Sequence, residues 1–184
     1  MPIKTNIRII ITRHQATLSL WWNARSHPTI ALTLFATTPV AAGAWEDGLA
    51  ARAAGDYQKA VRLFEPLAER RNVAAQQMLA LMYSQGKGVS KDDAKASYWW
   101  TKAAKQGSAM AQTNLAMRYM EGKGVPENDV RAYTWSSIAA AQGGPIAPMI
   151  KETAAKSMTP TQIAEAQKLS LELWEKYIVP FQKK

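Results

Sequence analysis

The chain has 184 residues, with 23 Lys and Arg against 14 Asp and Glu and a formal net charge of +9. This length suits one domain plus a tail. The absence of Cys excludes disulfides, thiolate nucleophiles and Cys-ligated metals. Both His residues, His14 and His27, lie near the N-terminus. From Trp45 onward the sequence therefore excludes a Ser-His-Asp triad, a Cys-His pair and a His-rich zinc site, and only carboxylate or Lys chemistry remains.

The first 44 residues have the three parts of a secretory signal peptide. They hold four basic and no acidic residues, then an apolar run from Thr29 to Thr37, then the small-residue sequence AAGA at 41–44. We expect cleavage after Ala44 and a periplasmic or secreted mature chain. The apolar run is short and is followed by Pro39, which argues against a membrane span. An uncleaved anchor and a disordered basic tail are the alternatives.

The segment from Ala75 to Gly107 recurs 36 residues later, from Ala111 to Gly143. A fixed period of this length predicts a stack of identical supersecondary units. The residues shared by the two copies include Gln76 and Gln112, Leu79 and Leu115, Tyr83 and Tyr119, Trp99 and Trp135, and a GKGV sequence at 86–89 and at 122–125.

Each copy predicts a helical hairpin. Apolar residues in both halves follow the i, i+3, i+4, i+7, i+8 spacing of a helix with one buried stripe. The GKGV sequence between the halves predicts a turn, and Asp92 or Asn128 after it predicts the N-cap of the second helix. The same spacing places Trp99 and Trp135 between helices, while Trp100 is left unassigned.

The pattern A-x-x-x-L-x-x-x-Y-x-x-G-x-G-V-x-x-D-x-x-K-A-x-x-W-x-x-K-A-A-x-x-G at 75–107 resembles the Sel1-like repeat, a relative of the tetratricopeptide repeat, in its secreted bacterial type. The resemblance implies an all-α fold: an α/α helical-hairpin repeat solenoid of about three units plus a C-terminal helical cap. We assign 1–44 to the signal peptide, 45–73 to a degenerate first unit, 74–109 and 110–144 to two repeats, and 145–184 to capping helices.

The two ends of the array differ from the repeats. Asp56 and Lys59 lie 36 residues before Asp92 and Lys95, but the first unit lacks the GKGV sequence. Atypical terminal units commonly act as caps. Near the C-terminus, the sequence Thr-Pro-Thr-Gln at 159–162 predicts a helix start, and an apolar stripe continues from it to Tyr177. We expect this last helix to cover the final repeat.

No residue is assigned to catalysis, to a metal or to a cofactor. The two glycine-rich GKGV sequences follow helices and recur once per repeat, so they predict turns rather than phosphate sites. The acidic pairs Asp92-Asp93 and Glu127-Asp129 stand at helix starts, where capping explains them. Residues 45–184 keep 19 basic and all 14 acidic residues, a net charge of +5, which we interpret as solvation.

These observations predict a non-enzymatic scaffold of the bacterial cell envelope that binds a protein or peptide through a concave helical groove. A cell-wall-associated enzyme or factor that acts on or binds peptidoglycan-related compounds is the alternative. We expect no nucleic-acid partner, no cofactor and no stable membrane span after cleavage. The groove is predicted from helix phase on the first helices of successive units, at Arg52, Gln77, Leu81, Gln85, Thr113, Met117, Met120 and Glu121. The alternative is that these residues are ordinary exposed positions with no partner.

Export gives the first testable prediction. Because the N-terminal segment has the three parts of a signal peptide, the protein recovered from the periplasm should begin at Trp45. Intact-mass measurement of the exported protein checks this. An intact N-terminus in the membrane fraction would contradict it.

Overall fold

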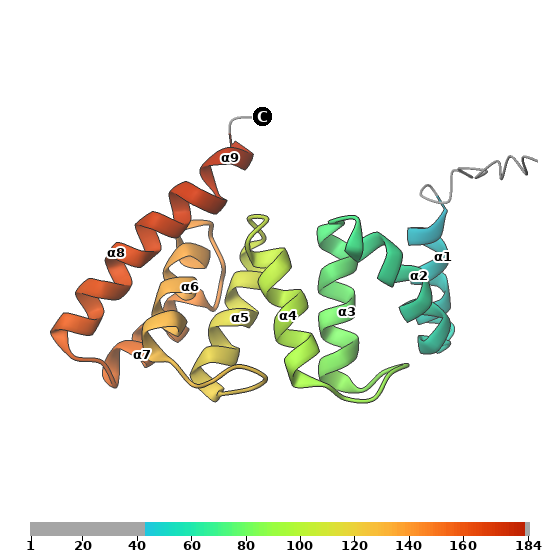
Figure 1. The fold of residues 1–184 in the computed structure, drawn as a ribbon, viewed down its shortest axis with the longest axis horizontal. Coiled ribbons are helices and arrows are strands. Elements are labelled where there is room, and N and C mark those ends of the chain that lie inside the picture. Colours follow the sequence, from blue (N-terminus) through green and yellow to red (C-terminus); the bar gives the residue numbers. More distant parts are fainter. Residues whose placement is uncertain (1–42, 183–184) are drawn as a thin grey trace, which may run out of the picture. The chain divides into compact units, whose positions relative to one another are not determined.

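The computed structural model describes residues 43–182, and within this range the regular structure is helical throughout (Figure 1). The sequence-based prediction of a signal peptide falls almost wholly on residues outside it. The helices are α1 (Ala44–Ala53), α2 (Tyr57–Glu69), α3 (Val73–Gln85), α4 (Asp93–Ala104), α5 (Ala109–Glu121), α6 (Asp129–Ala141), α7 (Ala147–Lys156), α8 (Pro160–Tyr177) and α9 (Val179–Gln182).

Each helix from α1 to α6 packs against the next one along the chain. The pairs α1–α2, α3–α4 and α5–α6 are the three predicted hairpins. After them, α7 packs on α6 and α5, and α8 packs on α6. The prediction of an all-α array of helical hairpins with a C-terminal helical cap is confirmed.

Helix starts are fixed by side-chain caps at the predicted positions. The Asp92 carboxylate accepts a hydrogen bond from the Lys95 amide at 2.9 Å, and Asn128 accepts one from the Arg131 amide at 2.8 Å. Each cap satisfies an amide that has no carbonyl partner inside its own helix. At the predicted start of α8, Thr159 and Gln162 form a reciprocal capping box.

The apolar stripes of paired helices meet in the core. Leu79 and Leu115 are fully buried, as the repeat pattern predicts. Trp135 is 4% exposed, which confirms its position between helices. Trp100 is 1% exposed and belongs to the buried core, whereas Trp99 beside it is only half-buried. Trp99 packs against two core clusters, so it lies between helices as predicted, and Trp100 is the more deeply buried of the two residues.

A buried glutamine links neighbouring units at two equivalent places. The Gln76 amide donates to the Ala68 carbonyl at the end of α2 (2.9 Å), and its oxygen accepts a hydrogen bond from Gln106 (2.8 Å). One repeat later, Gln112 donates to Ala104 (3.1 Å) and accepts from Gln142 (2.6 Å). Because Gln76 and Gln112 are 1% and 0% exposed, these bonds replace those that water would otherwise provide.

The GKGV turns join neighbouring units at the other end of the helices, away from the buried glutamines. Gly88 and Gly124 have φ angles of +76° and +72°, in the left-handed region that favours glycine. A Cβ on Gly88 would overlap the backbone of Tyr57, and a Cβ on Gly124 would overlap the backbone of Asp93. Each turn is therefore seated directly on the first turn of the second helix of the preceding unit.

The C-terminal helices cover the last repeat. Ala166 in α8 is fully buried, and Ile178, which follows α8, is 2% exposed. Tyr177 stacks on Trp135 of α6 with ring centroids 6.4 Å apart. Leu173 and Trp174 pack against the same core cluster while staying partly exposed. Such terminal cover is what a repeat array needs to remove its last apolar flank from water.

The close approach of the turns gives the second prediction. At Gly143, φ is +81° and a Cβ would meet nothing within 4 Å, so Gly143→Ala should cost only about 1 kcal/mol for the left-handed backbone. Gly124→Ala adds an overlap with backbone atoms, and we expect a loss of about 3 kcal/mol or more. Urea unfolding followed by circular dichroism measures both. Equal losses would show that Gly124 is needed for its φ angle alone.

Candidate partner-binding surfaces

The predicted groove residues come from three different helices, α1, α3 and α5. Arg52, Gln85 and Glu121 are exposed. The apolar members, Leu81, Met117 and Met120, are half-buried and pack against the cluster that contains Trp100 and Leu115. They therefore contribute to the core as well as to the surface.

Two polar members of the predicted groove are engaged within the fold. The Gln77 amide donates to the Ser108 hydroxyl at 2.6 Å. Thr113 is 6% exposed, and its hydroxyl donates to the Ala109 carbonyl at 2.9 Å. Thr113, predicted to line the groove, is instead almost fully covered, because the turn at Gly144 lies against its hydroxyl.

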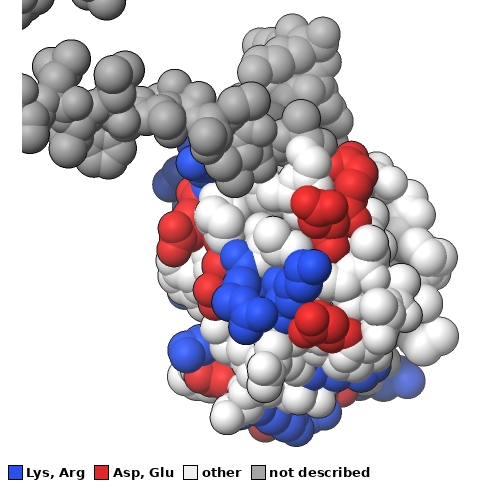
Figure 2. All heavy atoms as spheres, turned by 90° about the vertical axis from the view of Figure 1, so that its right-hand side faces the viewer, with Lys and Arg blue, Asp and Glu red and all other residues white. Residues whose placement is uncertain are grey.

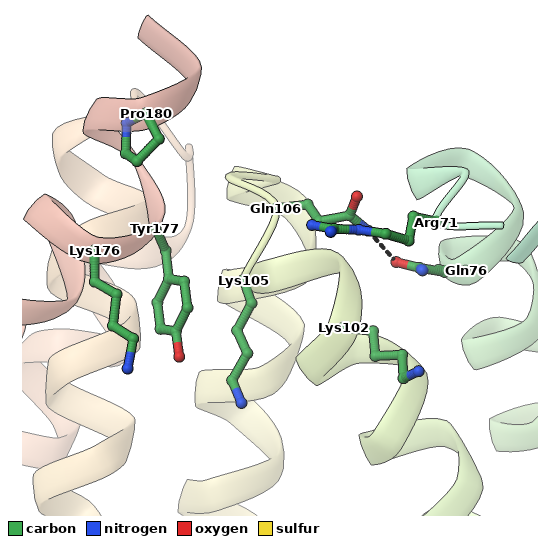
Figure 3. A pocket seen from close by; sticks show the side chains of 8 residues that line it. All are labelled: Arg71, Gln76, Lys102, Lys105, Gln106, Lys176, Tyr177 and Pro180. Atoms are coloured by element: carbon green, nitrogen blue, oxygen red, sulfur yellow. Dashed lines mark hydrogen bonds between the residues drawn. The ribbon is translucent and has the colours of Figure 1, made fainter. Parts of the chain in front are cut away.

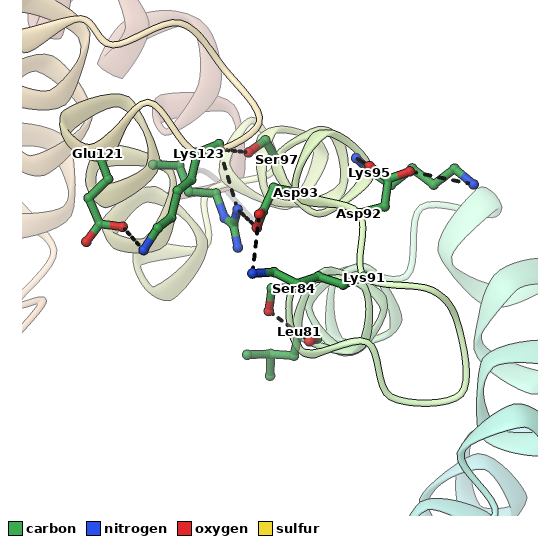
Figure 4. A network of polar contacts seen from close by, with 10 residues as sticks. Leu81, Ser84, Lys91, Asp92, Asp93, Lys95, Ser97, Glu121 and Lys123 are labelled. Carbon is green, nitrogen blue, oxygen red and sulfur yellow. Dashed lines mark hydrogen bonds and ion pairs between the residues drawn. The ribbon is translucent and has the colours of Figure 1, made fainter.

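A polar network lies where the 122–125 turn meets α4 (Figure 4). Ser97 donates to the Lys123 carbonyl at 2.8 Å, and Arg118 from α5 donates to Asp93 at 2.9 Å. This bond from Arg118 holds the pKa of the Asp93 carboxyl below its usual value, with a smaller contribution from Lys91. Glu121 is paired with Lys123 at 2.8 Å, so its carboxylate is partly neutralised.

A second polar contact ties the first unit to α3. The Tyr83 hydroxyl donates to the Glu65 carboxylate at 3.4 Å. Burial raises the pKa of the Tyr83 hydroxyl, and the neighbouring negative charge of Glu65 raises it further. Tyr83 therefore stays neutral at physiological pH and serves as a donor.

Charge is mixed on the end of the array that carries α1 and α2. Figure 2 shows basic and acidic side chains beside one another on this face. The sequence-based interpretation of the charge as solvation agrees with this view. It does not account for the basic side chains that gather at the ends of α4 and α8.

A basic pocket of about 410 Å³ opens where the end of α8 approaches the end of α4 and the turn between α2 and α3 (Figure 3). Its lining contains four cationic side chains and two aromatic or apolar ones: Arg71, Lys102, Lys105, Lys176, Tyr177 and Pro180, together with Gln76 and Gln106. Lys105 and Lys176 flank the Tyr177 ring, with their nitrogens 5.8 and 5.4 Å from its centroid.

A second pocket of about 380 Å³ adjoins it along α4 and shares Lys102 and Lys105 with it. This pocket extends past Tyr98 to the turn at Gly124 and Val125. Tyr98 is 52% exposed, and the Lys102 nitrogen lies 4.9 Å from its ring centroid. The exposed side of α4 therefore joins two hollows through the same pair of lysines.

Sequence reasoning missed this basic region. The four cations come from three separate segments, namely the end of α4, α8 and the 70–72 turn, so their convergence depends on how α8 folds back. A comparison of the repeats with the first unit gives one indication of this basic region. Arg71 lies 36 residues before Gly107 and 72 before Gly143, at the position where both repeats have glycine.

Neither surface has the ligand set of a metal centre: among the described residues no three His, Cys, Asp or Glu side chains gather in one place. Within residues 43–182, no helix is long and apolar enough to cross a bilayer.

Comparisons with known proteins agree with the architecture. The Sel1 repeat model matches at residues 42–72, 73–108 and 109–144. A protective antigen of uropathogenic Escherichia coli strains, described as displaying an SLR fold, is similar over 73% of this chain and 30% of its own, with 32% identity and a TM-score of 0.68. A Sel1 repeat protein from Oxalobacter formigenes is similar over 70% and 55% of the two chains, with 28% identity and a TM-score of 0.57.

No curated protein matches the chain. The chain spans about a third of the Escherichia coli antigen and about half of the Oxalobacter protein. The three matched repeats cover more than half of the chain, and they coincide with the three helical hairpins. The chain therefore belongs to the Sel1 repeat family.

Proposed function

We propose that the chain is a non-enzymatic scaffold of the bacterial cell envelope that binds a segment of a partner protein. Sel1 repeat proteins are in general protein-interaction scaffolds. The proposal adds the location, for which the support is the N-terminal sequence, and a binding surface on the first helices of the units. The absence of His and Cys from residue 45 onward also favours binding over catalysis.

The proposal rests on a comparison of the two repeats, position by position. Several positions that pack or link the units are the same in both copies, as at Gln76 and Gln112 or Leu79 and Leu115, although Trp100 is replaced by Ser136. The predicted groove positions differ. Leu81 and Gln85 are replaced by Met117 and Glu121 one repeat later. A surface shaped by a partner rather than by folding would vary in this way.

The groove retains both an apolar and a polar part. Leu81, Met117 and Met120 are half-buried and still reach the surface, where flexible methionines can adapt to different side chains. Arg52, Gln85 and Glu121 supply an exposed polar margin. A short helix or an extended peptide with apolar anchors would suit this combination.

Site-specific cross-linking tests the proposal. Since Leu81 and Met117 support the core, charged replacements there would also lower stability, and the exposed positions give a cleaner test. A photoreactive residue placed at Gln85 or at Glu121 should form adducts in living cells with the same envelope protein, identified by mass spectrometry.

Lys168, an exposed residue of α8, is the matched control position and should give no such adduct. Adducts of equal yield at Lys168 would contradict a binding surface on the first helices. A chain that gives no protein adduct and sediments with purified peptidoglycan would instead support the cell-wall-associated alternative.

A further inference from the structure

The two adjoining pockets along α4 form one continuous surface, which we call the basic trough: Arg71, Tyr98, Lys102, Lys105, Lys176 and Tyr177. Lys102 and Lys105 belong to both pockets, so a ligand in one pocket can extend into the other without leaving their charges. Figure 3 shows the part of the trough that lies between α8, α4 and the turn before α3.

The positive charge of the basic trough is not balanced locally. Of the described residues, no Asp or Glu lines either pocket. The ion pairs in the same part of the chain involve other cations, namely Lys91, Lys95, Arg118 and Lys123. A lysine at the end of a helix is favoured by the helix dipole, which explains Lys102 or Lys176 singly. It does not explain why four cations surround one hollow.

Arg71 has an unusual backbone conformation. Its φ angle is +67°, and among the described residues it is the one non-glycine with positive φ. The equivalent residues Gly107 and Gly143 have φ angles of +88° and +81°. Glycine adopts this conformation without steric strain, whereas a residue with a Cβ does not. The first unit therefore keeps an arginine where glycine would fit the fold better, and that arginine lines the basic trough.

The aromatic rings indicate the chemistry of the ligand. Tyr98 and Tyr177 lie beside the lysines, with Lys102, Lys105 and Lys176 within 6 Å of a ring centroid. An anion with no apolar part would use the cations and leave the rings without a contact. A peptide can place carboxylates on the cations and an apolar side chain on the rings, and the planar guanidinium of Arg71 can bind a carboxylate through two parallel hydrogen bonds.

We propose that the basic trough binds an acidic peptide segment of a partner protein, in which Asp or Glu side chains alternate with apolar ones. Arg71 and the three lysines bind the carboxylates, while Tyr98 and Tyr177 contact the apolar side chains. This site is distinct from the first-helix groove and adds a second recognition surface to the proposed scaffold. A failure here would leave the cross-linking result at Gln85 and Glu121 unaffected.

The test uses the mature chain and a fluorescein-labelled peptide of sequence Glu-Glu-Phe-Glu-Glu, with Gln-Gln-Phe-Gln-Gln as the uncharged control. Fluorescence anisotropy at low salt measures the dissociation constants. Arg71→Gly should weaken binding of the acidic peptide about tenfold, the loss expected for one charged hydrogen-bonding partner. It should not lower the melting temperature, because glycine relieves the backbone strain.

Arg70→Gln is the matched control, because Arg70 is an exposed neighbour of the same charge that does not line the trough. It should change binding less than twofold. A second variant, Lys102→Gln with Lys105→Gln, should weaken binding more than Arg71→Gly does, because both pockets lose charge.

Three results would overturn the proposal. The first is equal affinity for the acidic and the uncharged peptides. The second is an Arg71→Gly variant that binds as well as Arg70→Gln. The third is binding of inorganic polyphosphate that depends on Arg71 while the acidic peptide does not bind, which would assign the basic trough to a phosphate polymer.

Discussion

The hydrogen bonds of two buried glutamines, Gln76 and Gln112, join each repeat of this protein to the one before it. A helix leaves its last carbonyls without partners inside the helix, and the end of α4 is buried against the next unit. Gln112 satisfies one of these carbonyls, at Ala104, and itself accepts a hydrogen bond from Gln142 at the end of its own unit. One side chain thus fixes the spacing between the end of one hairpin and both ends of the next.

The seating of the turns supplies the same constraint at the other end of the helices. Gly124 lies so close to the backbone of Asp93 that no side chain fits between them, and Ser97 donates a hydrogen bond to the neighbouring Lys123 carbonyl. With both ends fixed, the remaining freedom lies in the outward-facing side chains. Functional differences between repeats can then accumulate at positions such as Gln85 and Glu121 without disturbing the stack.

The sequence predicts most of the fold because its signals are local and repeated. The apolar spacing, the caps at Asp92 and Asn128 and the GKGV sequences are each complete within one period of the sequence, so one period suffices to identify them. The relative burial of Trp99 and Trp100 could not be predicted in this way. Both lie on the apolar stripe of the same helix, and which of them is buried more deeply depends on the packing of the neighbouring helices.

The candidate surfaces could be predicted only in part. The first helices and their exposed residues follow from helix phase, but the burial of Thr113 depends on where the turn at Gly144 lies. The basic trough requires α8 to bring Lys176 and Tyr177 beside α4, a contact between distant segments that no local pattern encodes. Only Arg71 left a trace in the sequence, as an arginine in a position where the repeats have glycine.

A double-mutant cycle between Gln112 and Gln142 tests most directly whether Gln142 holds the buried Gln112 side chain in place for its bond to the Ala104 carbonyl of the preceding unit. The free energies of unfolding of Gln112→Ala, Gln142→Ala and the double variant should reveal a coupling of about 1 kcal/mol or more. Gln76 and Gln142 have different hydrogen-bond partners and are the control pair, for which the two losses should add. If the losses at Gln112 and Gln142 also add within about 0.3 kcal/mol, the two side chains do not act together, and Gln142 does not position Gln112 for its bond to the preceding unit.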